Sequence, residues 1–312
     1  MIETDEVQDW LNQFKGSDRL LAQSLVNSLT LVSSTQLVNG LREQIIEISN
    51  QNSGKCALIP IRKVQSKKYR KEGKEYRKQY SSADWIGYIL TELEREYEKR
   101  FRAEPTVESM RAEKVNNIIL VDDIIGTGKR VISFWKTLDK SIKSWISSKH
   151  CKIWLVSYVA HETGINSIIR QISPFRNENI YNLMMIESDK HSLNYRLEYL
   201  CTEYGRYTSK SGASLGYGNN QNLIIFEFSC PNNTPAILWA NGKRWKSLFP
   251  NRAIPSTLKT YFGKNKKIQQ LEILFENNQE RLVLSIYDAI DSHQMKDEYL
   301  VMHPTLVDNY ID

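Results

Sequence analysis

Residues 118–130 read IILVDDIIGTGKR, and this run decides the fold. A short, continuous apolar run is typical of a strand that is covered on both faces of a parallel sheet. Two adjacent carboxylates, Asp122 and Asp123, then leave the predicted strand, and a glycine-bearing loop carrying Lys129 and Arg130 follows. Ligands of open α/β sheets bind at the carboxyl ends of the strands. We therefore expect a binding site between the carboxylate pair and the loop.

The rest of the chain repeats the alternation of apolar runs and helical periodicity. Helical spacing of apolar residues predicts a helix over 36–48, which Ser33 and Gln36 begin as a capping box. Further helices are predicted over 82–97, over 131–146 beyond the loop, and around 165–172. Buried strands are predicted at 56–63, 151–160, 179–188 and 222–228. Strands that alternate with helices imply an α/β fold, a mostly parallel sheet with flanking helices and right-handed crossovers.

Three segments follow from this pattern. We expect a helical N-terminal extension over 1–50, the α/β core over 51–230, and a C-terminal extension over 231–312 packed on the core. The last segment contains a helical stretch at 267–290.

Composition narrows the class of protein. Hydrophobic residues make up 41% of the 312 residues and charged residues 25%, which is typical of a globular chain. The formal net charge of +6 permits an anionic partner. Four dispersed cysteines without a CxxC pair exclude the usual zinc spacing and make no disulfide framework. The N-terminus does not resemble a signal peptide, and no apolar run reaches the ~20 residues of a membrane helix, so we expect a soluble, cytoplasmic protein with no membrane partner.

The loop ending GTGK invites comparison with a nucleotide-triphosphate loop. That motif needs glycine where this chain has Asp123, and a serine or threonine where it has Arg130. A phosphosugar fits better, because two carboxylates can accept hydrogen bonds from a vicinal diol. The turn that follows can offer backbone N–H groups to a phosphate at a helix N-terminus. Gly126, Thr127 and Gly128 supply that turn.

These thirteen residues resemble the phosphoribosyl-diphosphate signature of type I phosphoribosyltransferases. The resemblance covers roughly residues 50–230. It implies that Asp122 and Asp123 contact the ribose hydroxyls, and meet Mg²⁺ only indirectly through the Mg²⁺-bound substrate. It implies that Gly126, Thr127, Gly128, Lys129 and Arg130 hold the 5-phosphate, where Arg130 replaces a hydroxyl residue of the family with a charged donor. It also implies a diphosphate loop at 59–63 with Arg62 and Lys63, then a flexible lid where this chain has its basic run 66–78. No zinc, flavin or nicotinamide is implied.

A narrower resemblance concerns residues 215–239 and 245–252. They are similar to phosphoribosyltransferase-like proteins of bacterial conflict systems, some of which accompany retrons. This implies an effector in anti-phage defence, with a reverse transcriptase and its RNA–DNA product, or another defence protein, as partners. An amide offers both a donor and an acceptor, so Asn232 and Asn233 are candidates for base recognition. The alternative is a plain turn, which Pro-Asn-Asn favours by itself.

Three classes of function remain open at this stage. The chain is an active transferase or ribosyl-bond-cleaving effector, a non-catalytic nucleotide sensor, or a scaffold for nucleic acid or a reverse transcriptase. The basic run 66–78 fits an exposed loop, a lid or a nucleic-acid contact. Two weaker candidates are His161 with Glu162, and Glu203 with Arg206. The acceptor base, the partner chains and the oligomeric state are not encoded in any motif of the sequence.

Overall fold

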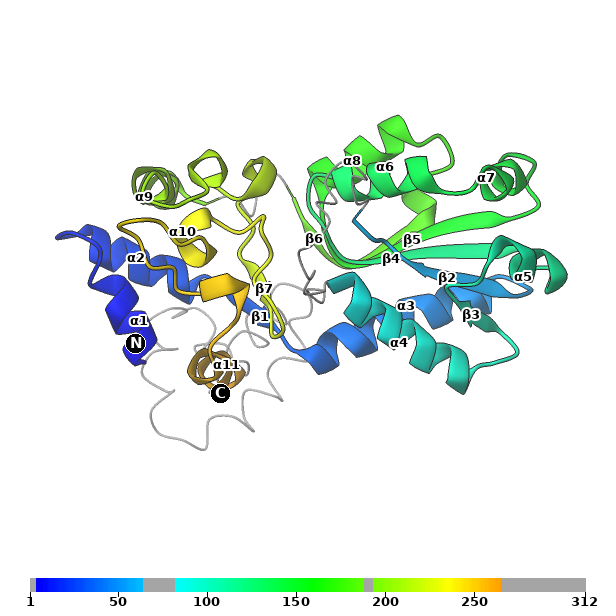
Figure 1. Cartoon of the computed structure of the whole chain (residues 1–312), viewed down its shortest axis with the longest axis horizontal. Helices are drawn as coiled ribbons and strands as arrows, with labels where there is room; N and C mark the ends of the chain where they lie inside the picture. Colours follow the sequence, from blue (N-terminus) through cyan, green and yellow to red (C-terminus); the bar gives the residue numbers. More distant parts are fainter. Residues whose placement is uncertain (1–3, 64–81, 188–192, 265–312) are drawn as a thin grey trace, which may run out of the picture. The chain divides into compact units, whose positions relative to one another are not determined.

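The computed structural model describes residues 4–63, 82–187 and 193–264 (Figure 1). The chain divides into two compact units, 1–255 and 256–312. The first unit contains the predicted binding site. Of the second unit, the described part is helix α11 (Ser256–Lys264). The basic run 66–78, the stretch 267–290 and most of the expected C-terminal extension lie outside the described residues.

A five-stranded parallel sheet forms the centre of the first unit, in the order β3-β2-β4-β5-β6. This confirms the predicted α/β class with a mostly parallel sheet. All nine residues of the middle strand β4 are buried, as its continuous apolar run requires. The strands are β2 (Cys56–Pro60), β3 (Phe101–Ala103), β4 (Asn117–Ile125), β5 (Lys152–His161) and β6 (Ile180–Ile186).

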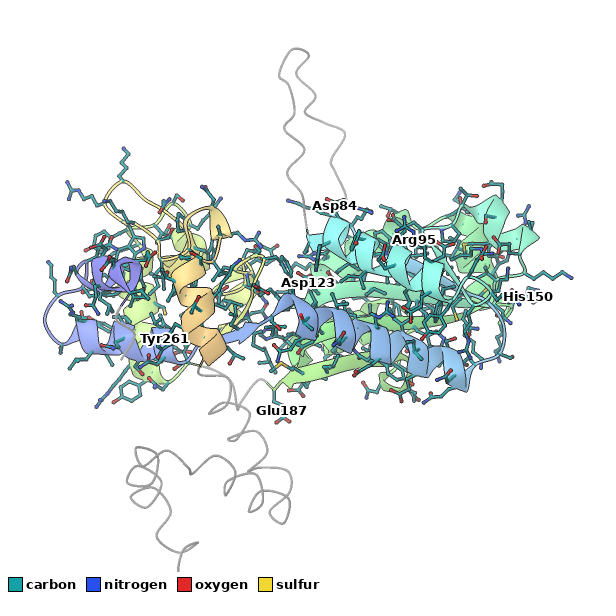
Figure 2. The ribbon with its side chains drawn as sticks, turned by 90° about the horizontal axis from the view of Figure 1, so that it is seen from below. Asp84, Arg95, Asp123, His150, Glu187 and Tyr261 are labelled. Atoms are coloured by element: carbon teal, nitrogen blue, oxygen red, sulfur yellow. The ribbon has the colours of Figure 1, made fainter. Side chains whose placement is uncertain are left out.

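Helices cover both faces of this sheet. Residues of β4 alternate between two hydrophobic clusters, with Ile119 and Val121 in one and Ile118 and Leu120 in the other. The first cluster includes α3 (Ser34–Gln51) and α4 (Ser82–Glu96), which lie side by side in Figure 2. The second includes α5 (Val107–Ala112), α6 (Lys129–Thr137), α7 (Lys140–Ser147) and α8 (Glu162–Gln171). In Figure 2 Asp123 and His150 mark opposite ends of the sheet, with Asp123 at the carboxyl end.

The remaining elements of the first unit form a second group around a two-stranded parallel sheet. There β1 (Thr30–Val32) pairs with β7 (Ile224–Phe226). The helices of this group are α1 (Asp5–Leu11), α2 (Asp18–Asn27), α9 (Tyr195–Gly205) and α10 (Ala236–Trp239). Single 3₁₀ turns of this group lie at Ser211–Ala213, Tyr217–Asn219 and Pro250–Arg252, whereas the turn Asn177–Asn179 directly precedes β6 of the main sheet.

This second group corrects one expectation. The strand predicted at 222–228 does form, but it pairs with β1 instead of joining the main sheet. The boundaries expected at 50 and 230 stay a prediction, and the described residues show how the helices before residue 51 pack. Helix α3 packs in the core of the main sheet, because its Leu37, Leu41, Ile45 and Ile48 join the cluster beneath β4. The N-terminal helices instead pack with late segments, as the Trp10 indole N–H donates to the Ile237 carbonyl at 3.2 Å.

Local chemistry explains where the helices begin and end. Ser33 caps α3 in the predicted box with Gln36, and the helix runs three residues past its predicted end. The helix predicted over 131–146 was wrong as one piece. Leu138 leaves helical geometry, and the Asp139 carboxylate accepts from the Ser141 N–H at 2.7 Å to begin α7. No helix in the described ranges has the length and apolar character needed to cross a membrane.

Candidate functional site

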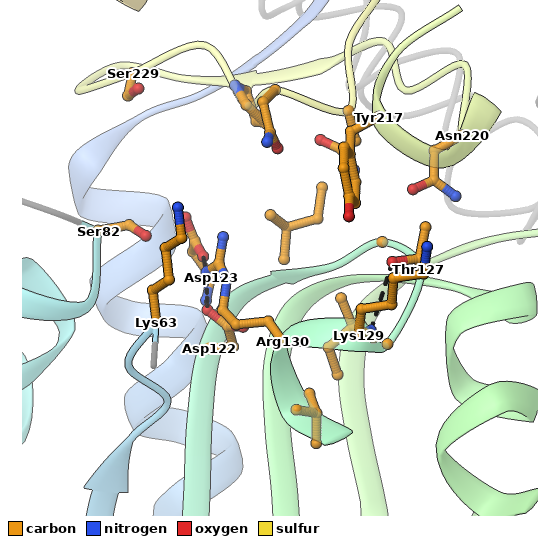
Figure 3. Close-up of a pocket in the computed structure, with 18 of the residues that line it drawn as sticks. Lys63, Ser82, Asp122, Asp123, Thr127, Lys129, Arg130, Tyr217, Asn220 and Ser229 are labelled. Carbon is orange, nitrogen blue, oxygen red and sulfur yellow. Dashed lines mark hydrogen bonds and ion pairs between the residues drawn. The ribbon is translucent and has the colours of Figure 1, made fainter. Parts of the chain in front are cut away.

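A cavity of about 400 Å³ lies at the carboxyl end of β4 (Figure 3). Its floor is formed by Asp122 to Ile125, the loop 126–128 and the first residues of α6. Its opposite wall comes from two segments far along the chain, the loop 215–221 and the turn 231–234, which together we name the cover. The volume lies within the range of small-molecule sites.

The carboxylate pair lies within β4 and does not follow its end. The ladder between β4 and β5 continues to Ile125, which pairs with Ala160, so both acids are held by strand geometry. Asp122 is 0% exposed and Asp123 is 5% exposed. In the described part of the chain, Oδ2 of Asp122 has no hydrogen-bond partner. The pair is therefore a rigid, buried set of acceptors at the base of the cavity.

Arg130, from the first turn of α6, binds both carboxylates. Its Nη1 lies 2.7 Å from Asp122 Oδ1 and 3.2 Å from Asp123 Oδ1. Burial raises the pKa of Asp122, and the charge of Arg130 opposes that rise. Asp122 in turn raises the pKa of Arg130, which stays cationic. The sequence had suggested that Arg130 faces the phosphate, whereas its guanidinium here contacts the carboxylates.

The loop 126–128, which joins β4 to α6, ends at an open helix N-terminus. Gly128, the N-cap of α6, has φ +73°, a left-handed conformation that glycine adopts without strain, and it supplies no side-chain cap. A long contact of 3.5 Å joins the Lys129 N–H to Thr127 Oγ1. The Lys129 ammonium lies over the ring of Tyr217, 5.6 Å from its centroid. N–H groups at such a helix start attract an anion, and the helix dipole adds to that attraction.

Helix α8 packs against the loop through Gly164, so a substitution at Gly164 tests the role of the loop. A Cβ at Gly164 would lie 2.0 Å from the Gly126 carbonyl oxygen, which is backbone and cannot rotate away. Helix propensity alone favours alanine there by about 1 kcal/mol. We expect the clash to dominate, and Gly164→Ala to weaken binding of inorganic phosphate about tenfold through lost N–H contacts.

Isothermal calorimetry with inorganic phosphate measures this effect. Gly212→Ala is the matched control, because a Cβ at Gly212 meets nothing within 4 Å. Unchanged phosphate affinity in folded Gly164→Ala would show that the loop does not hold the anion.

The cover lies directly against the loop. The Tyr217 N–H donates to the Asn232 carbonyl at 2.9 Å, which joins the two segments of the cover. A Cβ at Gly126 would lie 2.6 Å from Asn220 Oδ1 and 3.0 Å from Asn233 Nδ2. Among the described residues, Oδ1 of both asparagines is buried without a hydrogen-bond partner. The cover thus presents an aromatic ring and two acceptors that a ligand with N–H or O–H donors would satisfy.

Some of the predicted site residues line the cavity and others lie outside it. Lys63 lines the cavity, but Arg62 is held by Asp84 and Glu104, each at 2.7 Å. Asn232 and Asn233 line the cavity and also lie in the turn that the sequence favours, and their role in base recognition stays a prediction.

Two further pairs are not part of the cavity lining. His161 ends β5 and Glu162 begins α8, while Glu203 and Arg206 form an ion pair with each other.

Tyr217, Asn220, Ser82 and Arg252 also line the cavity and were missed from the sequence. The run LGYGNNQN, polar and rich in glycine between predicted elements, was the signal available for the first two. Cys230, which directly precedes the turn, does not line the cavity, and burial raises the pKa of its thiol to about 12. The described residues contain no group of three or more His, Cys, Asp or Glu able to hold a metal.

Comparison with solved structures finds several phosphoribosyltransferases of low identity. A Helicobacter pylori xanthine-guanine-hypoxanthine phosphoribosyltransferase matches at 10% identity with a TM-score of 0.27, covering 51% of this chain and 89% of that chain. A Leishmania tarentolae adenine phosphoribosyltransferase matches at 12% identity with a TM-score of 0.28, covering 56% of this chain and 90% of that chain.

No curated protein matches the chain. The family model described as PRTase-CE matches residues 7–251, which include the main sheet, the cover and the cavity lining except Arg252. The chain therefore belongs to the PRTase-CE family.

Proposed function

We propose that the cavity binds phosphoribosyl diphosphate or a related nucleotide. The observation that carries this is the meeting, in one cavity, of a buried carboxylate pair and an open helix N-terminus. Asp122 and Asp123 accept hydrogen bonds from the ribose hydroxyls. The N–H groups from Gly126 to Arg130, with the Thr127 hydroxyl and Lys129, bind the 5-phosphate. Four cationic side chains face two carboxylates in the lining, which favours an anionic ligand.

The diphosphate is assigned to the side of the cavity that Lys63 lines. Arg62, the other candidate, is engaged by two carboxylates and contributes little to the ligand. Mg²⁺ fits as an ion that the diphosphate carries, because the part of the lining that the structure describes offers only the two carboxylates as anionic ligands. When present there, Mg²⁺ supplies charge neutralisation to the diphosphate.

The base is assigned to the cover. Asn232 and Asn233 offer amide groups to a base edge, and Asn220 adds an unpartnered acceptor among the described residues. Tyr217, 47% exposed, presents a ring against which a base can stack.

If the chain turns over its ligand, the reaction is a substitution at C1 of the ribose. A base nitrogen uses its lone pair to form the new bond to C1. The C1–O bond breaks, and diphosphate leaves with the electron pair of that bond. The chain's residues act by holding the ribose and phosphate in position and by excluding water. No covalent bond to the protein is needed.

The role in defence rests on the resemblance of residues 215–239 and 245–252 to conflict-system proteins. On that basis we place the chain as an effector component of a bacterial, retron-type system, with a reverse transcriptase and its RNA–DNA product as candidate partners. Supporting that placement, the cover that lines the cavity is built from the first of these segments.

A matched pair of substitutions tests the binding proposal. We expect Lys63→Met to weaken phosphoribosyl diphosphate about tenfold, a loss typical of one charge-assisted contact, and to leave ribose 5-phosphate within about twofold. Arg62→Met removes the same charge one residue earlier, and should change neither affinity by more than about twofold, because Arg62 is paired elsewhere. Isothermal calorimetry on the full chain measures both affinities.

Absence of phosphoribosyl diphosphate binding by folded wild type would overturn the proposal. In that case salt-sensitive binding of RNA or DNA, unaffected by loss of Asp122 and Asp123, would identify the scaffold alternative. Equal losses for Lys63→Met and Arg62→Met would contradict the assignment of the diphosphate side.

A further inference from the structure

We infer that Arg130 takes the place of a divalent cation on the carboxylate pair, so that the chain binds the sugar-phosphate part of its ligand without Mg²⁺. This rests on the proposed function and names the counter-ion of the same site. On this inference, Mg²⁺ takes part only as an ion that the diphosphate of the ligand brings with it.

The first step is the geometry of the guanidinium. One nitrogen, Nη1, contacts Oδ1 of Asp122 and Oδ1 of Asp123 together, at 2.7 and 3.2 Å. It therefore bridges the two acids, as a bound cation would, and Figure 3 shows all three side chains at the base of the cavity. A guanidinium cannot lose its charge near neutral pH, so this counter-ion is permanently present.

The second step is the shortage of ligands for a metal. Mg²⁺ favours six oxygen ligands in near-octahedral geometry and gives up its water reluctantly. Asp122 and Asp123 are the carboxylates of the lining, and Arg130 already uses one oxygen of each. The described residues hold no cluster of three or more metal-binding side chains. From the side chains of the described lining, a metal would gain only the remaining carboxylate oxygens of these two acids, beside the positive charge of Arg130.

The third step is the charge of the surroundings. Besides Arg130, the cavity is lined by the cationic side chains Lys63, Lys129 and Arg252. These repel a second cation and attract the phosphates of a ligand. Arg130 thus leaves Oδ2 of Asp122, which has no hydrogen-bond partner among the described residues, as the acceptor for a sugar hydroxyl.

Ribose 5-phosphate is the probe, because it lacks the diphosphate that carries Mg²⁺. We expect wild type to bind it with affinities that agree within about twofold in Mg²⁺ and in EDTA. Arg130→Met leaves two adjacent carboxylates without a counter-ion. We expect its binding to weaken in EDTA and to recover about fivefold or more when Mg²⁺ is added.

Lys129→Met is the matched control. It removes the neighbouring cation of the same loop, which contacts Tyr217 and not the carboxylates in the contacts described. We expect weaker binding with equal affinities in Mg²⁺ and EDTA. Titration of Mg²⁺ alone should give no binding to ligand-free wild type and measurable binding to Arg130→Met. If Arg130→Met fails to fold, Arg130→Lys keeps the charge and should remain independent of Mg²⁺.

The outcomes are distinguishable. Loss of ribose 5-phosphate binding by wild type in EDTA, or binding of Mg²⁺ alone by wild type, overturns the inference and leaves the proposed function standing. Failure of wild type to bind the probe under either condition overturns the proposed function itself. Equal affinities in Mg²⁺ and EDTA for folded Arg130→Met also overturn the inference.

Discussion

Replacing Asp122 and Asp123 together by asparagine should lower the affinity for ribose 5-phosphate, relative to inorganic phosphate, about 30-fold. Hydrogen bonds to a charged acceptor are roughly twice as strong as neutral ones, so each lost charge costs about 1 kcal/mol per hydroxyl contact. Two contacts give about 2 kcal/mol, and 1.4 kcal/mol corresponds to a factor of ten. Calorimetry with both ligands measures the ratio.

The ratio is the useful quantity because the substitutions also change the charge of the cavity. Two negative groups disappear while Lys63, Lys129, Arg130 and Arg252 remain, so inorganic phosphate should bind as tightly as before or more tightly. Loss of both ligands would therefore indicate misfolding and not loss of sugar recognition.

The combination Asp139→Asn and Glu178→Gln is the control, since it removes the same charge at two exposed positions outside the lining. An unchanged ratio in the folded double variant of Asp122 and Asp123 would contradict the assigned role of the carboxylates.

The main sheet could be predicted because its strands are continuous apolar runs. The apolar runs at 118–121 and 151–160 predict strands that are buried on both faces. Both strands lie in the interior of the sheet, with neighbours on either side. The short strands β1 and β3 carry three residues each, too few for a periodic signal. The strand at 222–228 was visible as a strand, but its partner at 30–32 depends on tertiary packing.

The candidate site was predictable in the loop and not in its cover. Asp122, Asp123 and the loop 126–130 are contiguous, so their chemistry can be read as one motif. Tyr217 and Asn220 meet that loop only because the second group of elements folds over it, about 90 residues later in the chain. The spacing of the motif also does not predict that the Arg130 side chain contacts the carboxylates. Whether the guanidinium reaches a phosphate or the carboxylates depends on the geometry of the first turn of α6.

Trp10→Ala should destabilise the first unit by about 3–5 kcal/mol, because it removes a large side chain from a packed core. Trp10 is 2% exposed, and its ring lies 4.7 Å from Phe14 and 6.2 Å from Trp245, between centroids. Its indole N–H donates to the Ile237 carbonyl at 3.2 Å, a bond that alanine cannot replace. The substitution therefore loosens α1 from the segments that follow the cover. Guanidinium unfolding followed by far-UV circular dichroism measures the change.

Trp85→Ala is the control for the loss of one tryptophan. Trp85 is 36% exposed on α4 and stacks on Tyr88, which is itself 57% exposed, so its loss should cost about 1 kcal/mol or less. Equal destabilisation by the two substitutions would contradict the packing of the N-terminal helix against residues 237–245.

Because the turn 231–234 directly precedes that segment, a destabilised but folded Trp10→Ala chain should also bind ribose 5-phosphate more weakly, while Trp85→Ala should not. Retention of full affinity by Trp10→Ala would show that the cover keeps its place without the N-terminal helices.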